Sequence, residues 1–264
     1  MQSVKCEPMN AGPVTMTALE GLPPVRPGDE IADILTHALE RAQLVPTDQD
    51  IIIVAQKIVS KAEGRFVNLD GVSPSKEAIE LAKATGKEAR QVEVILSESD
   101  DIIRHKEGVI IAAHKLGLVL ANAGIDQSNV EQEASGERVL LLPVDSDRSA
   151  AEIKARLDRH FKANIGVIIS DSVGRPWRLG TVGLAIGAAG VPSLMDLRGQ
   201  RDLNGRPLEV AMTGFADGVS AAAELLMGEG AEGRPAVLVQ GLQWDASDQP
   251  ASALVRPKDE DMFR

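Results

Sequence analysis

The sequence predicts an α/β fold, with a mixed α+β arrangement as the alternative, because short β-branched runs alternate with helical patterns along its 264 residues. Several of these runs are apolar throughout, as in strands that are buried on both faces. Apolar residues make up 44% of the chain and charged residues 25%, which is the balance of an ordinary folded protein with a substantial core. We expect one or two closely joined domains.

Strands are predicted where β-branched residues cluster between turn residues. The predicted strands are residues 50–59, 108–113, 118–121, 139–142, 166–170 and 236–240.

Three helices are predicted from capping residues and apolar spacing. The first begins with Ser73 and Pro74, carries Ala78, Ile79 and Ala82 on its apolar face, and ends near Gly86.

The second helix has capping-box spacing between Ser149 and Glu152, followed by Ile153, Leu157 and Phe161 on one face. The third covers about residues 216–227 and ends at a Gly-Glu-Gly sequence.

The expected organisation is an N-terminal segment of residues 1–20, a main domain of residues 21–244 and a polar tail of residues 245–264. The tail contains proline and is expected to be loose. Asn204 and Gly205 predict a tight hairpin turn within the domain.

Composition excludes several classes of protein. The net charge of −11 is spread along the chain and no basic stretch is interleaved with aromatic residues, so nucleic-acid binding is not expected. A single cysteine, Cys6, rules out an internal disulfide and zinc sites built on paired cysteines. Neither a signal peptide nor an apolar run of about 18 residues is present, so we expect a cytoplasmic protein that does not bind membranes.

Three acidic residues are candidates for metal binding. Asp126, Asp171 and Glu229 each stand where a predicted strand or helix gives way to a turn. Carboxylates are the ligands that magnesium and manganese prefer, whereas the four histidines lack ligand spacing. The alternative is structural: the two aspartates form caps or turns, and Glu229 is a solvated loop residue.

Basic residues suggest an anionic ligand. Lys57 and Lys61 stand at the end of the strand predicted for residues 50–59, from which a lysine can reach a phosphate. They can equally be ordinary edge lysines. Arginines gather around glycine-rich turns, which suggests recognition of an anionic substrate, although surface positions are the default for each of them. They are Arg175, Arg178, Arg198, Arg201 and Arg206.

Familiar nucleotide and hydrolase motifs are missing. Lys87 follows a glycine but precedes Glu88 rather than Ser or Thr, so there is no P-loop. Gly183, Gly187 and Gly190 have the wrong spacing for a dinucleotide fingerprint and indicate tight packing of small residues. Serines at 170 and 172 lack the surroundings of a serine hydrolase elbow.

Five segments resemble the coenzyme F420-0:L-glutamate ligase family and occur in that family's order. The resemblance covers roughly residues 21–243. The segments are residues 20–23 (EGLP), 58–64 (IVSKAEG), 122–129 (NAGIDQSN), 171–175 (DSVGR) and 226–230 (LMGEG).

The resemblance implies a GTP-dependent ligase with two Mg²⁺ or Mn²⁺ ions and possibly a monovalent cation. GTP would activate the carboxylate of F420-0 as an acyl phosphate, and the amine of L-glutamate would then displace phosphate. It also implies a family-specific ligase fold in an intertwined homodimer. Phosphoryl transfer of this kind needs positioning and charge neutralisation more than a protein nucleophile.

The resemblance also assigns residues to the site. Asp126 and Asp171 would hold the first metal, Ser172 and Glu229 the second, and the three acids would be the catalytic residues. Arg175 and Arg178 are weaker candidates for the substrate. The nucleotide would be bound by Leu22, Pro23, Pro24, Val25, Gln56, Lys57, Lys61, Asn129 and a loop of residues 227–233 that includes Met227, Gly228 and Gly230.

Three positions depart from the family's pattern. Ser172 replaces the usual threonine, Lys57 replaces a small hydroxyl residue of some members, and Val173 replaces asparagine or methionine. Ser172 keeps a hydroxyl ligand, whereas the other two affect nucleotide and substrate recognition. Three other functions are compatible with parts of the sequence: a ligase for a different acid, a metal-dependent phosphohydrolase and a non-catalytic deazaflavin-binding module.

Overall fold

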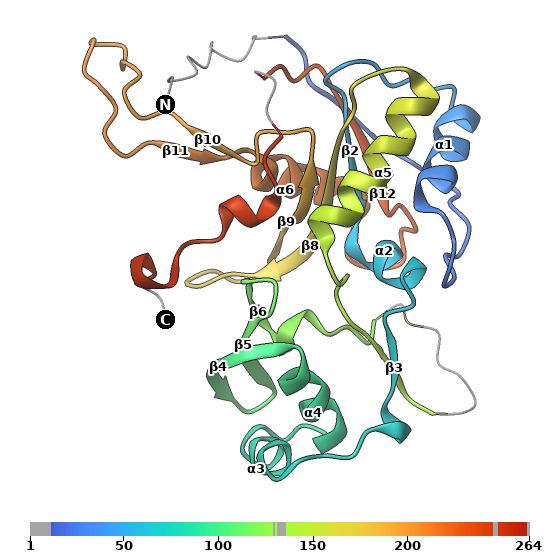
Figure 1. The fold of residues 1–264 in the computed structure, drawn as a ribbon, viewed down its shortest axis with the longest axis vertical. Helices are drawn as coiled ribbons and strands as arrows, with labels where there is room; N and C mark the ends of the chain where they lie inside the picture. Colours follow the sequence, from blue (N-terminus) through green and yellow to red (C-terminus); the bar gives the residue numbers. More distant parts are fainter. Residues whose placement is uncertain (1–11, 129, 131–135, 245–247, 263–264) are drawn as a thin grey trace.

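The protein has the α/β fold that its sequence predicts, and its elements form two lobes (Figure 1). A computed structural model describes residues 12–128, 130, 136–244 and 248–262. Within these residues the larger lobe is a five-stranded sheet in the order β1-β12-β2-β8-β9, with helices on both faces. The smaller lobe contains a three-stranded antiparallel sheet, β4-β5-β6, and two helices.

The strands are β1 (Thr15–Ala18), β2 (Ile51–Ala55), β3 (Phe66–Asn68), β4 (Ser99–Lys106), β5 (Val109–His114), β6 (Val119–Ala121), β7 (Arg138–Leu140), β8 (Gly166–Gly174), β9 (Thr181–Ala189), β10 (Leu194–Asp196), β11 (Met212–Gly214) and β12 (Ala236–Gln240). The α-helices are α1 (Ile31–Arg41), α2 (Gln56–Ala62), α3 (Lys76–Thr85), α4 (Ala89–Ser97), α5 (Ser146–Phe161) and α6 (Phe215–Met227). Short 3₁₀ turns are η1 (Leu69–Gly71), η2 (Asn122–Gly124), η3 (Ala251–Leu254) and η4 (Lys258–Glu260).

Alternation along β2 explains why the large sheet is covered on both faces. Ile52 and Val54 pack in a core with α1 and α5, whereas Ile51 and Ile53 pack in a second core with α6. All four side chains are buried. A strand with two buried faces is apolar at every position, which is the pattern seen in its sequence.

The parallel pair β2 and β8 places the candidate site. Ala55 at the end of β2 pairs with Ser170 of β8. The residues that follow therefore lie at the same edge of the sheet: Gln56 and Lys57 begin α2, while β8 continues with Asp171 and Ser172. This edge is where open α/β sheets commonly bind ligands.

The smaller lobe has its own core. Ala78 and Ala82 of α3, Val92 and Ile95 of α4 and Ile110 of β5 are buried together. The paired strands β3 and β7 connect this lobe to the large sheet (Figure 1). The β10–β11 pair extends away from the body of the molecule.

The strand predicted for residues 50–59 is wrong beyond Ala55. There the chain turns into α2, in which the buried Ser60 Oγ donates to Gln56 Oε1 at 2.8 Å. Lys57 and Lys61 consequently lie one helical turn apart on α2 rather than at a strand end. A continuous apolar run does not distinguish a buried strand from a buried helix.

Two predicted helix starts are also wrong. The N-cap of α3 is Ser75, whose Oγ accepts from Ala78 N at 3.1 Å, so Ser73 and Pro74 lie outside the helix. Its end at Gly86 is confirmed by a φ of +67°, but Ile79 is 40% exposed rather than buried.

The N-cap of helix α5 stands four residues before the expected N-cap, Ser149. Its N-cap is Asp145, which accepts from Arg148 N at 3.0 Å. Ser149 lies inside the first turns and donates to Asp145 O. The prediction of α6 is confirmed to within one residue, and the run at 236–240 is β12.

Two further sequence observations are confirmed in modified form. Gly183 and Gly187 permit tight packing, because a Cβ would lie 2.6 Å from Ser220 O at the first and overlap Ser146 O at the second. The Asn-Gly pair occurs in a turn closed by a hydrogen bond from Gly205 N to Asp202 O at 2.9 Å, so Asn204 stands one position later in the turn than in a two-residue Asn-Gly hairpin.

The expected loose tail is partly docked. Asp147 of α5 accepts from Ala251 N at 2.6 Å, and Ser193 Oγ donates to Gln249 O at 2.8 Å. Within the N-terminal segment, β1 pairs with β12. The expected domain boundaries remain a prediction. In the part of the chain that the structure describes, no helix has the length and apolar character needed to cross a membrane.

Candidate active site

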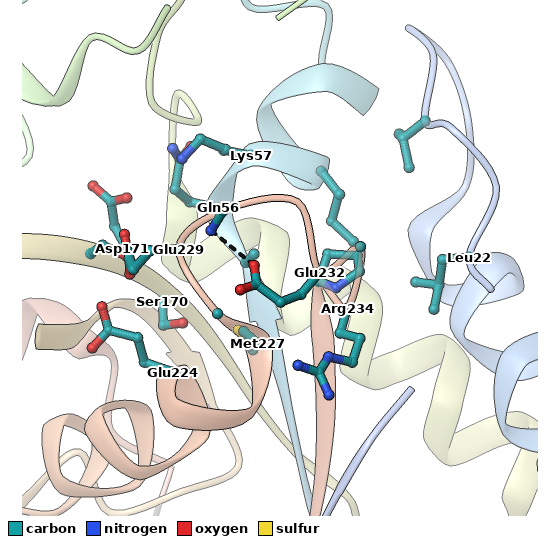
Figure 2. A pocket seen from close by; sticks show the side chains of 18 of the residues that line it. Leu22, Gln56, Lys57, Ser170, Asp171, Glu224, Met227, Glu229, Glu232 and Arg234 are labelled. Atoms are coloured by element: carbon teal, nitrogen blue, oxygen red, sulfur yellow. Dashed lines mark hydrogen bonds between the residues drawn. The ribbon is translucent and has the colours of Figure 1, made fainter. Parts of the chain in front are cut away.

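A cleft of about 630 Å³ opens at the end of β2, beside residues 170–172 of β8. Its walls are α2, β8, the end of α6 with the loop that follows, and the segment before α1. In Figure 2 the carboxylates of Asp171, Glu224 and Glu229 lie on one side of this cleft, and Leu22 lies on the opposite side.

Most of the residues predicted for the site line this cleft. They are Leu22, Pro23, Pro24, Val25, Gln56, Lys57, Lys61, Asp171, Ser172, Met227, Gly228, Glu229 and Gly230. Asp126 contacts the cleft through Lys57. Arg175 and Arg178 lie beyond the lining, in the turn between β8 and β9, where Arg175 Nη1 donates to Gly180 O at 3.1 Å. Asn129 lies outside the described residues. The roles predicted for these residues remain predictions.

Lys57 lies among the acidic groups of the cleft. Its Nζ is 2.6 Å from Asp126 Oδ2, and its charge also acts on Asp171. Burial raises the pKa of Asp171 to about 6, although the positive charge of Lys57 works in the opposite direction. The prediction that Asp171 stands at the end of its strand is wrong, because β8 continues to Gly174. Asp171 pairs with Leu184 of β9, whereas the pairing of β8 with β2 ends one residue earlier, at Ser170.

Asp126 is fixed by both its backbone and its side chain. Its main chain exchanges two hydrogen bonds with Leu140, at 2.9 and 2.8 Å. Its Oδ1 accepts from Ser128 N and Ser128 Oγ, both at 2.7 Å, in a local turn. One oxygen of Asp126 therefore forms a local turn, as in the structural alternative given above, while the other contacts Lys57.

Glu229 approaches the same site from the loop after α6. The hydroxyl of Ser172 donates to Glu229 Oε1. Burial raises the pKa of Glu229, but its contact with Glu224 and the hydrogen bond from Ser172 hold the value below its ordinary range. The loop begins at Gly228 with φ +76° and ψ +166°, a conformation available essentially to glycine alone.

Glu224, on the last turns of α6, was not predicted. Its carboxylate accepts from Gly183 N and faces Ser172 and Glu229. Burial, followed by the neighbouring Glu229, raises the pKa of Glu224. The signal that could have indicated it is a single acid in the otherwise apolar run Ala221 to Met227, five residues before Glu229.

The loop also supplies lining residues that the sequence did not indicate, among them Glu232 and Arg234. Glu232 Oε2 accepts from Gly230 N at 2.8 Å and so closes the loop on itself. Figure 2 shows Glu232 and Arg234 away from the group of three acids.

The donor set fits a hard cation, although it is not closed around one. No cluster of three or more His, Cys, Asp or Glu side chains in metal-binding geometry occurs among the described residues. The groups at the site are carboxylates and a serine hydroxyl, which are oxygen ligands suited to Mg²⁺ or Mn²⁺. Moreover, Glu224 Oε1 is buried without a hydrogen-bond donor. Asp126, Asp171, Ser172 and Glu229 are the residues that would hold such ions.

Comparison with known proteins identifies close relatives along almost the whole chain. A coenzyme F420:L-glutamate ligase of Methanothermobacter thermautotrophicus is 43% identical over 253 residues, which are 95% of this chain and 99% of the relative. The same enzyme of Methanopyrus kandleri is 43% identical over 91% of this chain and 93% of its own. That of Archaeoglobus fulgidus is 39% identical over 95% and 96%, respectively.

The α/β fold and these relatives define the protein as an enzyme of the ligase class. The model of the F420-0:gamma-glutamyl ligase family matches residues 21–241. The chain belongs to this family, as its five sequence segments suggested.

Proposed function

We propose that this protein adds L-glutamate to F420-0 in a reaction driven by GTP. The carrying observation is that residues from four separate segments, residues 22–25, α2, β8 and the loop after α6, line one cleft. Their chemistry combines lysines, carboxylates and a glycine-rich loop, which suits a phosphorylated nucleotide with bound cations. The names of the family and of the relatives support F420-0 and L-glutamate as the substrates.

The cleft suggests where the nucleotide binds. Lys57 and Lys61 stand one turn apart on α2 and both face the cleft. Backbone N–H groups of the loop from Gly228 to Gly233 can approach phosphate oxygens closely, because glycines leave the backbone uncovered. Pro23, Pro24 and Val25 offer an apolar surface to the base.

The reaction is proposed to proceed in two displacements. A carboxylate oxygen of F420-0 attacks the γ-phosphorus of GTP, and the bond to the β–γ bridging oxygen breaks. GDP departs, and F420-0 becomes an acyl phosphate. The neutral amine of glutamate then attacks the acyl carbon, phosphate leaves, and the nitrogen loses one proton as the amide forms. Bound Mg²⁺ or Mn²⁺ would neutralise phosphate charge during both displacements.

The protein's own groups would position these reactants. Asp171 and Ser172 are fixed by the pairing of β8, and Glu229 is brought to Ser172 by the loop. Lys57 forms an ion pair with Asp126 and its charge also acts on Glu229. When cations bind these acids in its place, the ammonium group of Lys57 can bind a phosphate instead. The proposal includes a cytoplasmic homodimer, two divalent ions, and a monovalent cation as a further option.

Product analysis tests the proposal. Purified protein would be incubated with F420-0, L-glutamate, GTP and MnCl₂, and the products analysed by mass spectrometry. We expect F420-0 to gain glutamyl residues, and GDP and phosphate to appear only when both acceptor and glutamate are present. ATP in place of GTP, and a different acid in place of F420-0, are the matched controls.

The same assay discriminates the alternatives. Phosphate release that is indifferent to F420-0 and glutamate would replace the ligase with a phosphohydrolase. Glutamate transfer to another acid only would retain the ligase and change its substrate. Binding of F420-0 without any binding of GTP in calorimetry would indicate a non-catalytic module.

A further inference from the structure

The outer edge of β9 is closed by three acidic side chains. Asp217 accepts from Ala185 N and Asp147 accepts from Ala188 N, both at 2.9 Å, and Glu224 accepts from Gly183 N. Asp217 and Glu224 both belong to α6, two turns apart, and make the same kind of contact to the same strand. They differ in what their second oxygen faces.

Only Glu224 of these two lines the cleft. Its Oε1 is buried and has no hydrogen-bond donor, while its neighbours are Ser172 and the carboxylate of Glu229. The serine hydroxyl is already donated to Glu229 Oε1. Two carboxylates in contact with no donor between them repel each other, unless a proton or a cation lies between them.

The strand opposite is adapted to this approach. A Cβ on Gly183 would lie 2.6 Å from Ser220 O and 3.2 Å from the Cβ of Glu224. Glycine at this position therefore lets α6 pack directly on β9 and brings Glu224 to the level of Ser172, which pairs with Gly183 across the sheet. A contact that served only to cap Gly183 N would need one carboxylate oxygen, as at Asp217.

We propose that Glu224 is a further cation-binding residue of the cleft and shares one divalent ion with Ser172 and Glu229. This inference rests on the use of divalent ions in the proposed function. Glu224 joins the ion through Oε1 while Oε2 keeps its hydrogen bond to Gly183. The site of the second ion thereby gains a ligand from a helix, in addition to those from a strand and a loop.

Mn²⁺ binding tests the proposal without any turnover. Free Mn²⁺ would be titrated by electron paramagnetic resonance against the wild type, Glu224→Gln and Asp217→Asn, in the absence of nucleotide at pH 8.5. Gln retains an oxygen for Gly183 N but cannot donate negative charge. We expect Glu224→Gln to weaken one class of Mn²⁺ site by about tenfold or more, and Asp217→Asn to bind as the wild type does.

Thermal unfolding provides an independent readout. Without metal, Glu224→Gln should raise Tm by about 1–3 °C, because the amide can donate to Glu229 where two carboxylates repelled each other. With saturating Mn²⁺ the wild type should gain more in Tm than this variant. A residue that only capped the strand would change neither quantity.

The outcomes distinguish the role of Glu224 from the metal dependence of the proposed function. If the wild type binds Mn²⁺ and Glu224→Gln binds it equally well, the role of Glu224 is overturned and the proposed function stands. If the wild type binds neither Mn²⁺ nor Mg²⁺, the metal dependence in the proposed function is overturned. Equal weakening in Asp217→Asn would show that packing of α6 controls affinity, and would also overturn the role of Glu224.

Discussion

The two walls of the cleft hold their polar groups by different means. On one wall, Asp171 and Ser172 belong to β8 and pair with Leu184 and Gly183 of β9. On the other wall, Glu229 stands in a glycine-rich loop and is exposed. The strand fixes a carboxylate through the register of the sheet, whereas the loop depends on backbone conformations that glycine permits. We therefore expect β8 to tolerate changes of charge without moving, and the loop to respond to ligands.

The largest effect is expected at the strand. Asp171→Asn should lower turnover on the order of 10²–10³-fold, because the amide cannot balance a divalent ion although it is nearly isosteric. The thermal unfolding midpoint should stay close to that of the wild type. Initial rates and circular dichroism would be measured together, and unchanged turnover would remove Asp171 from the site.

A smaller, recoverable loss is expected in the loop. Glu229→Gln should weaken metal–nucleotide binding by about 10–100-fold and should be partly restored by high Mn²⁺. Its Tm without ligand should hardly change, since the side chain is exposed. Phosphate release would be followed across a Mn²⁺ titration, with and without glutamate. A variant that metal cannot rescue, in an enzyme that releases phosphate without either acceptor, would indicate a hydrolase in which Glu229 is a general base.

A third prediction concerns Lys61 of α2, a helix that also lines the cleft. Lys61→Ala should raise KM for GTP about tenfold, the equivalent of one charge-assisted hydrogen bond, and should change KM for glutamate less. Steady-state kinetics with each substrate varied would measure the two constants. The reverse order would assign Lys61 to the acceptor.

The smallest effect on the site is expected between the lobes, where Arg65 Nη2 lies 2.6 Å from Glu98 Oε2. The adjacent His114, and then Arg65, hold the pKa of Glu98 below its ordinary value despite partial burial. A lowered folded-state pKa stabilises the protein above the ordinary value of 4.5, and this contribution is lost as pH falls through the folded pKa.

Glu98→Gln should therefore lower Tm at pH 7 by a few degrees and leave kcat unchanged. The difference from the wild type should shrink below about pH 4. Melts over pH 3–8 would measure this, and a constant difference across that range would contradict it.

The sequence predicted elements whose ends carry distinct signals. Residues 236–240 follow Pro235 and precede Gly241, and the strand has those bounds. The border between β2 and α2 was missed, because no Gly, Pro, Asn or Asp separates the apolar residues before Gln56 and Lys57 from those after them. Strand β9 was not predicted either. Glycine and alanine have low strand propensity, and it is the close approach of α5 and α6 that selects them.

The site was predictable where a role depends on residue type and neighbouring glycines. Asp171 and Glu229 were found in this way, Ser172 was indicated by the family resemblance alone, and all three line the cleft. Glu224 was missed because an acid in a helix is usually solvated, and only the fold shows that it faces inward. Arg175 and Arg178 were selected for their charge, yet the turn between β8 and β9 carries them beyond the lining.

The closed edge of β9 also affects how molecules of this protein can meet. A strand at the margin of a sheet normally has unpaired N–H groups that can pair with another chain, which leads to edge-to-edge association. At Gly183, Ala185 and Ala188 these groups already donate to carboxylates. Carboxylates accept hydrogen bonds but cannot imitate a partner strand, and they repel one another's copies. Pairing with a further strand is therefore blocked at these three positions, which protects this margin of the sheet against ordered aggregation.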